Sequence, residues 1–231
     1  MKILALVTAR GGSVRLPGKN LKPLGGKPLI NWSIEIAKNI PEICEILVST
    51  DNESIADVSR QAGALVPWLR PQELSTNEAS SVDVALHALN WYEAEKEIID
   101  GLLLLQPTSP FRSKQTVLNG ITLFEKNGLL PVVGVSPTHA HPLWSFKIEK
   151  GELLSFVDNS GIQNRSQDLP PAYIVNGNFY LSSPSDLRKN NSFFGPRMIP
   201  LIVESEQEAL DIDTELNFAF AEFIHKNIVQ N

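Results

Sequence analysis

The sequence is poor in cysteine, because Cys44 is the only one among its 231 residues. A single cysteine excludes an intramolecular disulfide framework, and its apolar neighbours favour a buried structural thiol over a nucleophile. No apolar run reaches the roughly 18 residues that cross a bilayer, and the first residues lead directly into an apolar strand, which leaves no room for a signal peptide. We therefore expect a cytoplasmic protein in a reducing compartment.

The chain also lacks an excess of positive charge. Its 20 lysine and arginine residues are outnumbered by 26 acidic residues, for a formal net charge of -6. This balance argues against a general nucleic-acid binder, whose affinity depends on a basic surface. The length suits one large α/β domain, and a hydrophobic content of 42% is ordinary for a globular core. We predict a single domain over residues 1–231, with no nucleic-acid or membrane partner.

Short apolar runs alternate with stretches of helical periodicity. The first run is continuously apolar and ends at glycines, as in a parallel strand that is buried on both faces. Alternation of strands and helices predicts a mostly parallel, Rossmann-like sheet flanked by helices. The predicted strands are 3–8, 45–50, a strand beginning at 101, and 130–136; the predicted helices are 29–38, 53–62, a helix from Ser80 or Ser81 through Leu89, and 114–126.

A glycine-rich, basic loop follows the first strand, in the string ARGGSVRLPGKN of residues 9–20. Its glycines let backbone N–H groups approach an anion, and its basic side chains add positive charge. Pro17 and Asn20 do not fit a Walker A loop, which disfavours a P-loop kinase or NTPase. The loop predicts another kind of phosphate site, although a solvated surface loop remains open on composition alone. The glycines of this loop are Gly11, Gly12 and Gly18, and its basic residues are Arg10, Arg15, Lys19 and, just after the string, Lys22.

Polar residues also stand at the ends of later predicted strands. Asp51 and Gln106 are placed, like the basic loop, at the carboxyl ends of strands, where open α/β sheets bind ligands. Asp51 is equally compatible with a turn or capping role before the next helix. We expect these positions to lie along one edge of the sheet.

Two carboxylates, Asp211 and Asp213, precede an amphipathic helix. Alternate positions of an extended segment point the same way, and a pair of carboxylates is a hard oxygen site suited to Mg²⁺. The alternative is that Asp213 or Thr214 only caps the helix.

Together these strings resemble the acylneuraminate cytidylyltransferases, the CMP-sialic acid synthetase family. The resemblance runs from about residue 3 to 222 and rests on ARGGSVRLPGKN with GKPLI, RPQELSTNEASS, LLQPTSPFR and DIDTE. It implies a nucleotide-diphospho-sugar transferase fold and transfer of CMP from CTP to N-acylneuraminate, with release of pyrophosphate. It also implies a protruding dimerisation element, residues 138–182, that reaches the active site of the second subunit of a homodimer.

The resemblance further implies roles for individual residues. Lys19 and Arg10 would be catalytic, and Asp211 and Asp213 would bind Mg²⁺. Arg112 is a weaker candidate for a structural or anion contact. The nucleotide would contact Ala9, Arg10, Gly11, Gly12, Ser13, Lys19, Asn20, Arg70, Ala79 and Ser81, and the sugar acid would contact Gln106, Arg165, Asn176, Tyr180, Phe193 and Phe194.

Several alternatives remain open. The chain departs from the family at Val14 and Arg15, where a loop lysine is usual, and at Trp144 and Ser166, so legionaminic or pseudaminic acid are rival substrates. Phe193 and Phe194 could be plain core residues, and the serines before the third helix could serve only as caps. A catalytically inactive, nucleotide-binding regulator is the alternative of another class.

Overall fold

The computed structural model describes residues 1–76, 78–138, 140–157 and 165–229. Within them the main sheet consists of β1 (Ile3–Thr8), β4 (Ile43–Ser49), β5 (Gly101–Leu104), β6 (Val132–Pro137), β9 (Tyr173–Ser182) and β10 (Ile199–Ile202). The strand order is β10-β6-β9-β5-β1-β4. Only β9 runs against its neighbours among these six strands of the described chain, so the predicted mostly parallel sheet is confirmed.

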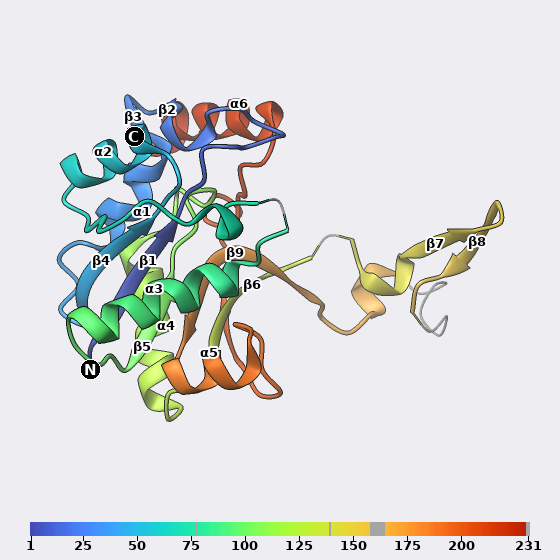
Figure 1. The fold of residues 1–231 in the computed structure, drawn as a ribbon. Helices are drawn as coiled ribbons and strands as arrows, with labels where there is room; N and C mark the ends of the chain where they lie inside the picture. Colours follow the sequence, from blue (N-terminus) through green and yellow to red (C-terminus); the bar gives the residue numbers. More distant parts are fainter. Residues whose placement is uncertain (77, 139, 158–164, 230–231) are drawn as a thin grey trace.

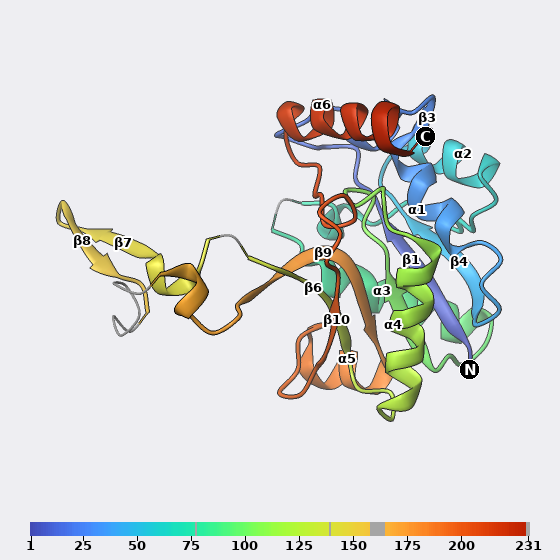
Figure 2. The same ribbon diagram turned by 180° about the vertical axis from the view of Figure 1, so that it is seen from behind.

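Helices cover both faces of this sheet (Figures 1 and 2). Because successive strand residues point to opposite faces, Ile3, Ala5 and Val7 of β1 join one core cluster, whereas Leu4 and Leu6 join another. The first cluster includes residues of α1, α2 and α4, and the second includes residues of α3 and α5. The helices are α1 (Leu29–Ala37), α2 (Glu53–Gln61), α3 (Ser81–Glu95), α4 (Lys114–Lys126), α5 (Pro184–Asn190) and α6 (Glu215–Ile224).

The last of these helices, α6, lies across one end of the sheet, beside the short strands β2 (Pro23–Leu24) and β3 (Lys27–Pro28) (Figures 1 and 2). A third core cluster joins Leu16, in the basic loop, and Leu24, in β2, to Ile212 and Phe218 near the end of the described chain. The basic loop is therefore packed directly against the segment that carries the carboxylate pair.

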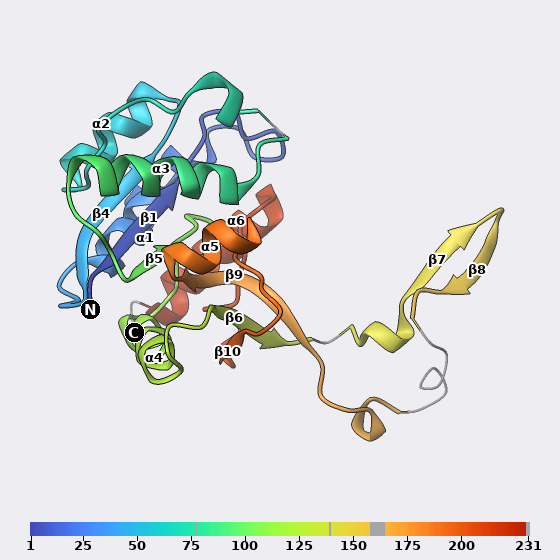
Figure 3. The same ribbon diagram turned by 60° about the horizontal axis from the view of Figure 1, so that its bottom comes forward.

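A slender arm leaves the globular body after β6 and ends in the hairpin of β7 (Phe146–Glu149) and β8 (Glu152–Ser155) (Figure 3). The predicted element of residues 138–182 is longer than this arm. Its last part belongs to β9, whose side chains from Asn176 to Ser182 are mostly buried and whose backbone pairs with β5 and β6. Short 3-10 turns η1 (Lys19–Leu21), η2 (Gln72–Leu74), η3 (Pro142–Trp144) and η5 (Ser166–Asp168), and a π-helical turn η6 (His225–Val229), complete the elements.

The prediction of a buried Cys44 is wrong, because this residue is exposed. Ile3 pairs with Ile43 and Leu4 pairs with Glu45, so Cys44 is the extra residue of an irregularity in the edge strand β4. Such a bulge turns one residue out of the regular alternation. The thiol still lies 3.3 Å from the carbonyl oxygen of Ile3.

The described part of the chain contains no helix that is both long and apolar enough to span a membrane.

Candidate active site

The basic loop after β1 is held by hydrogen bonds to other loops. The backbone N–H of Gly11 donates to Asp51 Oδ1 at 2.8 Å, and the side chain of Asn20 donates to the carbonyl oxygen of Arg10 at 3.0 Å. Asn52, and not Asp51, caps α2, since its Oδ1 accepts from the N–H of Ile55. The suggested capping role of Asp51 is therefore wrong: this carboxylate fixes the loop.

Two of the three N–H groups from Gly11 to Ser13 already have hydrogen-bond partners within the protein. The N–H of Gly11 is bonded to Asp51, and the N–H of Ser13 donates to the carbonyl oxygen of Gly11 at 3.1 Å. Gly11 is required for close approach, because a Cβ there would come within 2.9 Å of the Asn52 side chain. The loop thus offers an anion chiefly its charged side chains.

Lys19 connects this loop to the carboxylate pair. Its side chain is only 11% exposed, and Nζ lies 2.9 Å from the carbonyl oxygen of Ile212 and 3.0 Å from Asp213 Oδ1. Arg15 contacts the other oxygen of the same carboxylate, with Nη2 at 2.6 Å from Asp213 Oδ2. The two basic side chains therefore hold Asp213 between them.

The carboxylates themselves are positioned by their neighbours. Ile212 is fully buried between Asp211 and Asp213, which sends both carboxylates to the opposite side. Thr214 caps α6 in a reciprocal capping box with Asn217, so the capping alternative holds for Thr214 and not for Asp213. Asp211 is exposed as a residue, yet the protein atoms around its carboxyl raise its pKa, while a hydrogen bond from the Thr108 hydroxyl lowers it.

The pair fits a hard divalent cation. The negative charge of Asp213 also raises the pKa of Asp211, and a cation between the two would relieve that repulsion. Mg²⁺ commonly takes one or two protein carboxylates and fills its other positions with water and phosphate oxygens. No group of three or more acidic, histidine or cysteine residues that could enclose a metal occurs among the described residues, so substrate oxygens would have to complete the shell.

Around these residues lies a cavity of about 430 Å³, here called the loop pocket. It brings together residues from the basic loop, the end of β5 and the carboxylate segment. Ala9, Gly11 and Gly12 shape the loop backbone and do not line this pocket. The lining residues are Thr8, Arg10, Ser13, Val14, Arg15, Lys19, Asn20, Ser81, Gln106, Pro107, Thr108, Asp211 and Asp213.

A second cavity of about 260 Å³, the Arg70 pocket, adjoins the loop pocket through Thr8, Arg10 and Ser81. Ala79 also lines it, as predicted for a nucleotide contact. Arg70 is buried, and its guanidinium donates to the hydroxyl of Ser49 at 3.0 Å and to the carbonyl oxygen of the same residue.

Burial lowers the pKa of Arg70. Through its bonds to Ser49, Arg70 braces the end of β4 as well as forming a pocket wall.

Ser80 is the cap of α3, accepting from the N–H of Asp83 at 3.2 Å, and Ser81 needs no capping role.

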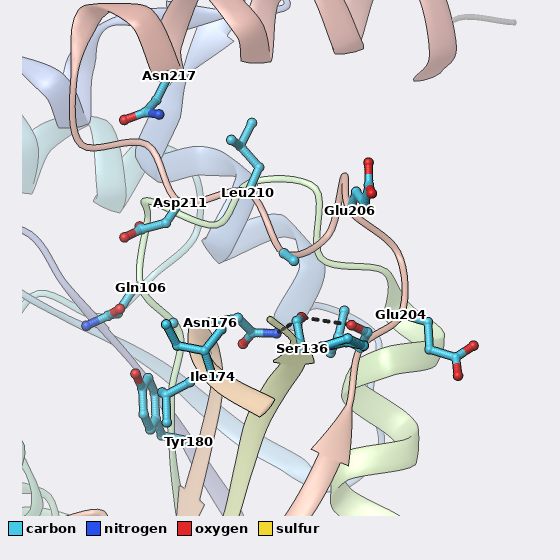
Figure 4. Close-up of a pocket in the computed structure, with 15 residues that line it drawn as sticks. Gln106, Ser136, Ile174, Asn176, Tyr180, Glu204, Glu206, Leu210, Asp211 and Asn217 are labelled. Carbon is cyan, nitrogen blue, oxygen red and sulfur yellow. Dashed lines mark hydrogen bonds between the residues drawn. The ribbon is translucent and has the colours of Figure 1, made fainter. Parts of the chain in front are cut away.

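Gln106 also borders two further cavities. The arm-side pocket, about 720 Å³, includes Asn176 and Asp211, and the aromatic pocket, about 220 Å³, includes Phe193 and Phe194. Gln106 and Tyr180 line both. In Figure 4, Gln106, Tyr180 and Asp211 lie along one side of the arm-side pocket, while Glu204 and Glu206 lie on the opposite side.

Phe193 and Phe194 differ in burial, so the core role and the pocket role considered for them apply differently to each. Phe193 is 6% exposed and belongs to the core cluster of α3, whereas Phe194 is 46% exposed. Both rings pack against Tyr180, with centroid distances of 5.8 Å for Phe193 and 6.0 Å for Phe194. Phe193 is thus a core residue with one face in the pocket, and Phe194 is a wall of the pocket.

Arg112 is the buried support of this region. Its guanidinium donates to the carbonyl oxygens of Asn178 and Gln106, and burial lowers its pKa to about 9. These contacts fit the structural reading. Arg112 ties the end of β5 to β9, next to the side chains that face the pockets.

The predicted sugar contact Arg165 lies elsewhere. It is exposed, stands on the arm just before η5, and lines none of the four pockets described above. Trp144 also belongs to the arm, in η3. The side chain of Ser166 lies outside the described residues. Within one chain, therefore, the structure brings together the other predicted site regions but not Arg165.

Comparison with known proteins agrees with these features. A family model described as cytidylyltransferase matches residues 4–139. The chain is 38% identical to the CMP-N,N'-diacetyllegionaminic acid synthase of Legionella pneumophila, over 96% of this chain and 95% of that protein. This chain belongs to the cytidylyltransferase family. It is therefore a nucleotidyltransferase, and the P-loop kinase alternative is excluded.

Two further proteins are similar to this chain at lower sequence identity. An N-acylneuraminate cytidylyltransferase of Streptococcus agalactiae is 33% identical over 94% of this chain, which spans 52% of that protein. The solved structure of CMP:2-keto-3-deoxy-manno-octonic acid synthetase complexed with CTP matches with a TM-score of 0.71, covering 100% of this chain and 99% of that one, at 18% identity. The second likeness confirms the fold.

Two residues of this candidate site, Thr8 and Thr108, were not predicted as functional, and Asp51 has a role other than those expected for it. Thr8 lines two pockets, Thr108 bonds Asp211, and Asp51 anchors the loop. A signal existed for the threonines, since each lies at or just beyond the carboxyl end of a parallel strand. Nothing local indicates that Asp51 would accept from Gly11, 40 positions away.

We predict that Lys19→Ala lowers kcat at least about 100-fold, because it removes a buried positive charge from the loop pocket. The measurement is steady-state pyrophosphate release with CTP. Lys27→Ala is the matched control, since Lys27 pairs with Glu35 and stacks on Trp32 outside this pocket. Near-normal turnover by Lys19→Ala would contradict the assignment.

Proposed function

We propose that this cytidylyltransferase transfers CMP from CTP to the anomeric hydroxyl of a nonulosonic acid and releases pyrophosphate, with N,N'-diacetyllegionaminic acid as the substrate. The observation that carries this proposal is the position of Gln106. It lines the loop pocket, the arm-side pocket and the aromatic pocket, so a basic compartment meets two compartments of mixed polar and apolar character at one side chain. A nucleotide and a sugar acid could meet there.

In the proposed arrangement the triphosphate occupies the loop pocket and the base and ribose occupy the Arg70 pocket. Arg10 lines both pockets and Lys19 lines the first, so their charges would neutralise the phosphates and the departing pyrophosphate. Ser81 lies between the two pockets, as expected for a ribose contact. Ser13 and Asn20 complete the wall of the loop pocket.

The reaction requires the sugar hydroxyl and the leaving pyrophosphate to be in line at the α-phosphorus. Gln106, Asn176 and Tyr180 would hold the sugar acid on one side of that phosphorus, and Lys19 and Arg10 would hold the pyrophosphate on the other. Asp211 and Asp213 are the residues that would bind Mg²⁺, which supplies neutralisation of phosphate charge when bound. No covalent enzyme intermediate is needed.

The choice of sugar acid rests on the relatives and on the aromatic pocket. The legionaminic relative is 38% identical along nearly its whole length, compared with 33% for the N-acylneuraminate relative. Phe194 and Tyr180 offer an apolar wall to an acyl-amino group. N-acetylneuraminic acid and pseudaminic acid are the alternatives that the test must separate.

A homodimer is the second part of the proposal. Apolar side chains cover the arm, where Ile148 and Leu153 face each other across the hairpin with exposures of 74% and 67%. An isolated two-stranded hairpin is marginally stable in water, and an exposed apolar patch indicates an interface. A second copy that covers the arm would also bring its Arg165 toward a sugar site. A cytoplasmic location, also proposed, accords with a chain whose only cysteine, Cys44, is free.

We predict that CTP and Mg²⁺ give pyrophosphate release fastest with N,N'-diacetyllegionaminic acid, by about tenfold or more in kcat/KM over the other acids. The panel contains N-acetylneuraminic and pseudaminic acids, with the eight-carbon acid Kdo as a control. A higher kcat/KM for another nonulosonic acid would reassign the substrate. Silence across the panel, with CTP still bound, would favour the inactive regulator.

We predict that Asp211→Asn and Asp213→Asn each raise the Mg²⁺ concentration for half-maximal rate by about tenfold, because a charged ligand is lost. The measurement is the initial rate against Mg²⁺ at saturating CTP. Glu215→Gln, in the first turn of α6, is the matched control. An unchanged Mg²⁺ titration in both variants would argue against the metal assignment.

We predict that Ile148→Asp with Leu153→Asp converts a dimer to monomers, because two charges would be buried in the apolar interface. Light scattering after gel filtration measures the mass. Ile98→Asp, at an equally exposed isoleucine (73%) in the body of the protein, is the control and should stay dimeric. A wild-type monomer at all concentrations would refute the homodimer.

A further inference from the structure

The two cations that hold Asp213 are not equivalent. Lys19 is 11% exposed and is fixed by the carbonyl oxygen of Ile212 as well as by Asp213 Oδ1. Arg15 is 68% exposed and holds Asp213 Oδ2 at 2.6 Å from the open side of the loop. An exposed ion pair of this kind is weak, typically worth a factor of about five or less. Of the two contacts with Asp213, the one made by Arg15 is therefore the one that another cation can replace.

A metal ion at Asp213 must compete with this contact. Mg²⁺ at Oδ2 of Asp213 competes with the guanidinium, because the two cations repel each other and Mg²⁺ demands a close, regular shell. Lys19 cannot readily give way, because it is buried and bonded on two sides. Oδ2 of Asp213 is thus the oxygen that becomes accessible, provided that Arg15 leaves it.

The departing Arg15 has another partner within the same cavity. It lines the loop pocket together with Arg10 and Lys19, the residues assigned to the phosphates. A guanidinium pairs well with phosphate oxygens through its fixed fork of donors. Val14 beside it is 73% exposed, so no packed side chain at that position ties this part of the loop to the core.

We propose that Arg15 is a built-in counter-ion that occupies the metal side of Asp213 and exchanges onto the nucleotide phosphates when metal and nucleotide bind. This inference rests on the proposed metal and CTP sites. Its consequence is that metal binding and CTP binding are coupled. A metal ion that binds alone must break the pair between Arg15 and Asp213, whereas a metal ion that binds with CTP lets Arg15 pair with the phosphates. By reciprocity, each ligand strengthens the binding of the other through Arg15.

The test is a titration of Mn²⁺, with free ion measured by electron paramagnetic resonance, with and without CTP and with no sugar acid present. Arg15→Gln should bind Mn²⁺ about two- to fivefold more tightly than wild type in the absence of CTP. With CTP, its gain in Mn²⁺ affinity should be several-fold smaller than in the wild type. Arg15→Lys, which keeps the charge, should retain part of the coupling.

Lys22→Gln is the matched control, since Lys22 is a basic residue of the same loop that pairs instead with Glu215 at 2.6 Å. It should behave as the wild type. Unchanged or weaker Mn²⁺ binding by Arg15→Gln without CTP, or undiminished coupling, would overturn the inference while leaving the metal site intact. If Asp213→Asn binds Mn²⁺ as the wild type does, the metal assignment itself fails, and this inference fails with it.

Discussion

The ion pair between Lys19 and Asp213 is the interaction on which the site depends. It joins residues 194 positions apart, and the core cluster of Leu16, Ile212 and Phe218 joins the same two segments. Without α6 packed across the end of the sheet, the basic loop would have no partner for its lysine and the carboxylates would have no fixed direction. One contact therefore sets both the charge of the loop pocket and the placement of the candidate metal ligands.

Buried arginines give the neighbouring strand ends a different kind of support. Arg70 and Arg112 bond mainly to backbone carbonyl oxygens at the ends of β4 and β5, and both lose part of their basicity through burial. Removing a charge from water is costly, so such residues persist where they fix geometry. Here they hold the ends of β4 and β5 beside the loop pocket, which Thr8, Gln106 and Asp211 line. Such fixed geometry suits a site that aligns two substrates.

Features that depend on local chemistry could be predicted from the sequence. Helix α4 begins and ends at the predicted residues, 114 and 126, and the alternation at Asp211 and Asp213 correctly gave two carboxylates on one side. Features that depend on distant partners could not. The acceptor role of Asp51 and the irregular pairing that exposes Cys44 arise between segments that are adjacent only in the fold. The exposed position of Arg165, away from the pockets described above, likewise depends on the path of the arm and not on the local sequence.

The position of α6 also has a consequence for how the protein reaches its working state. The basic loop leaves the ribosome long before the residues that neutralise and position it, since chains emerge from the amino end. Contacts with so large a sequence separation form late, after much of the chain entropy has been lost. Most of the sheet can assemble while the loop still carries unmatched charge. Completion of the loop pocket then waits for the segment that carries Asp211 and Asp213.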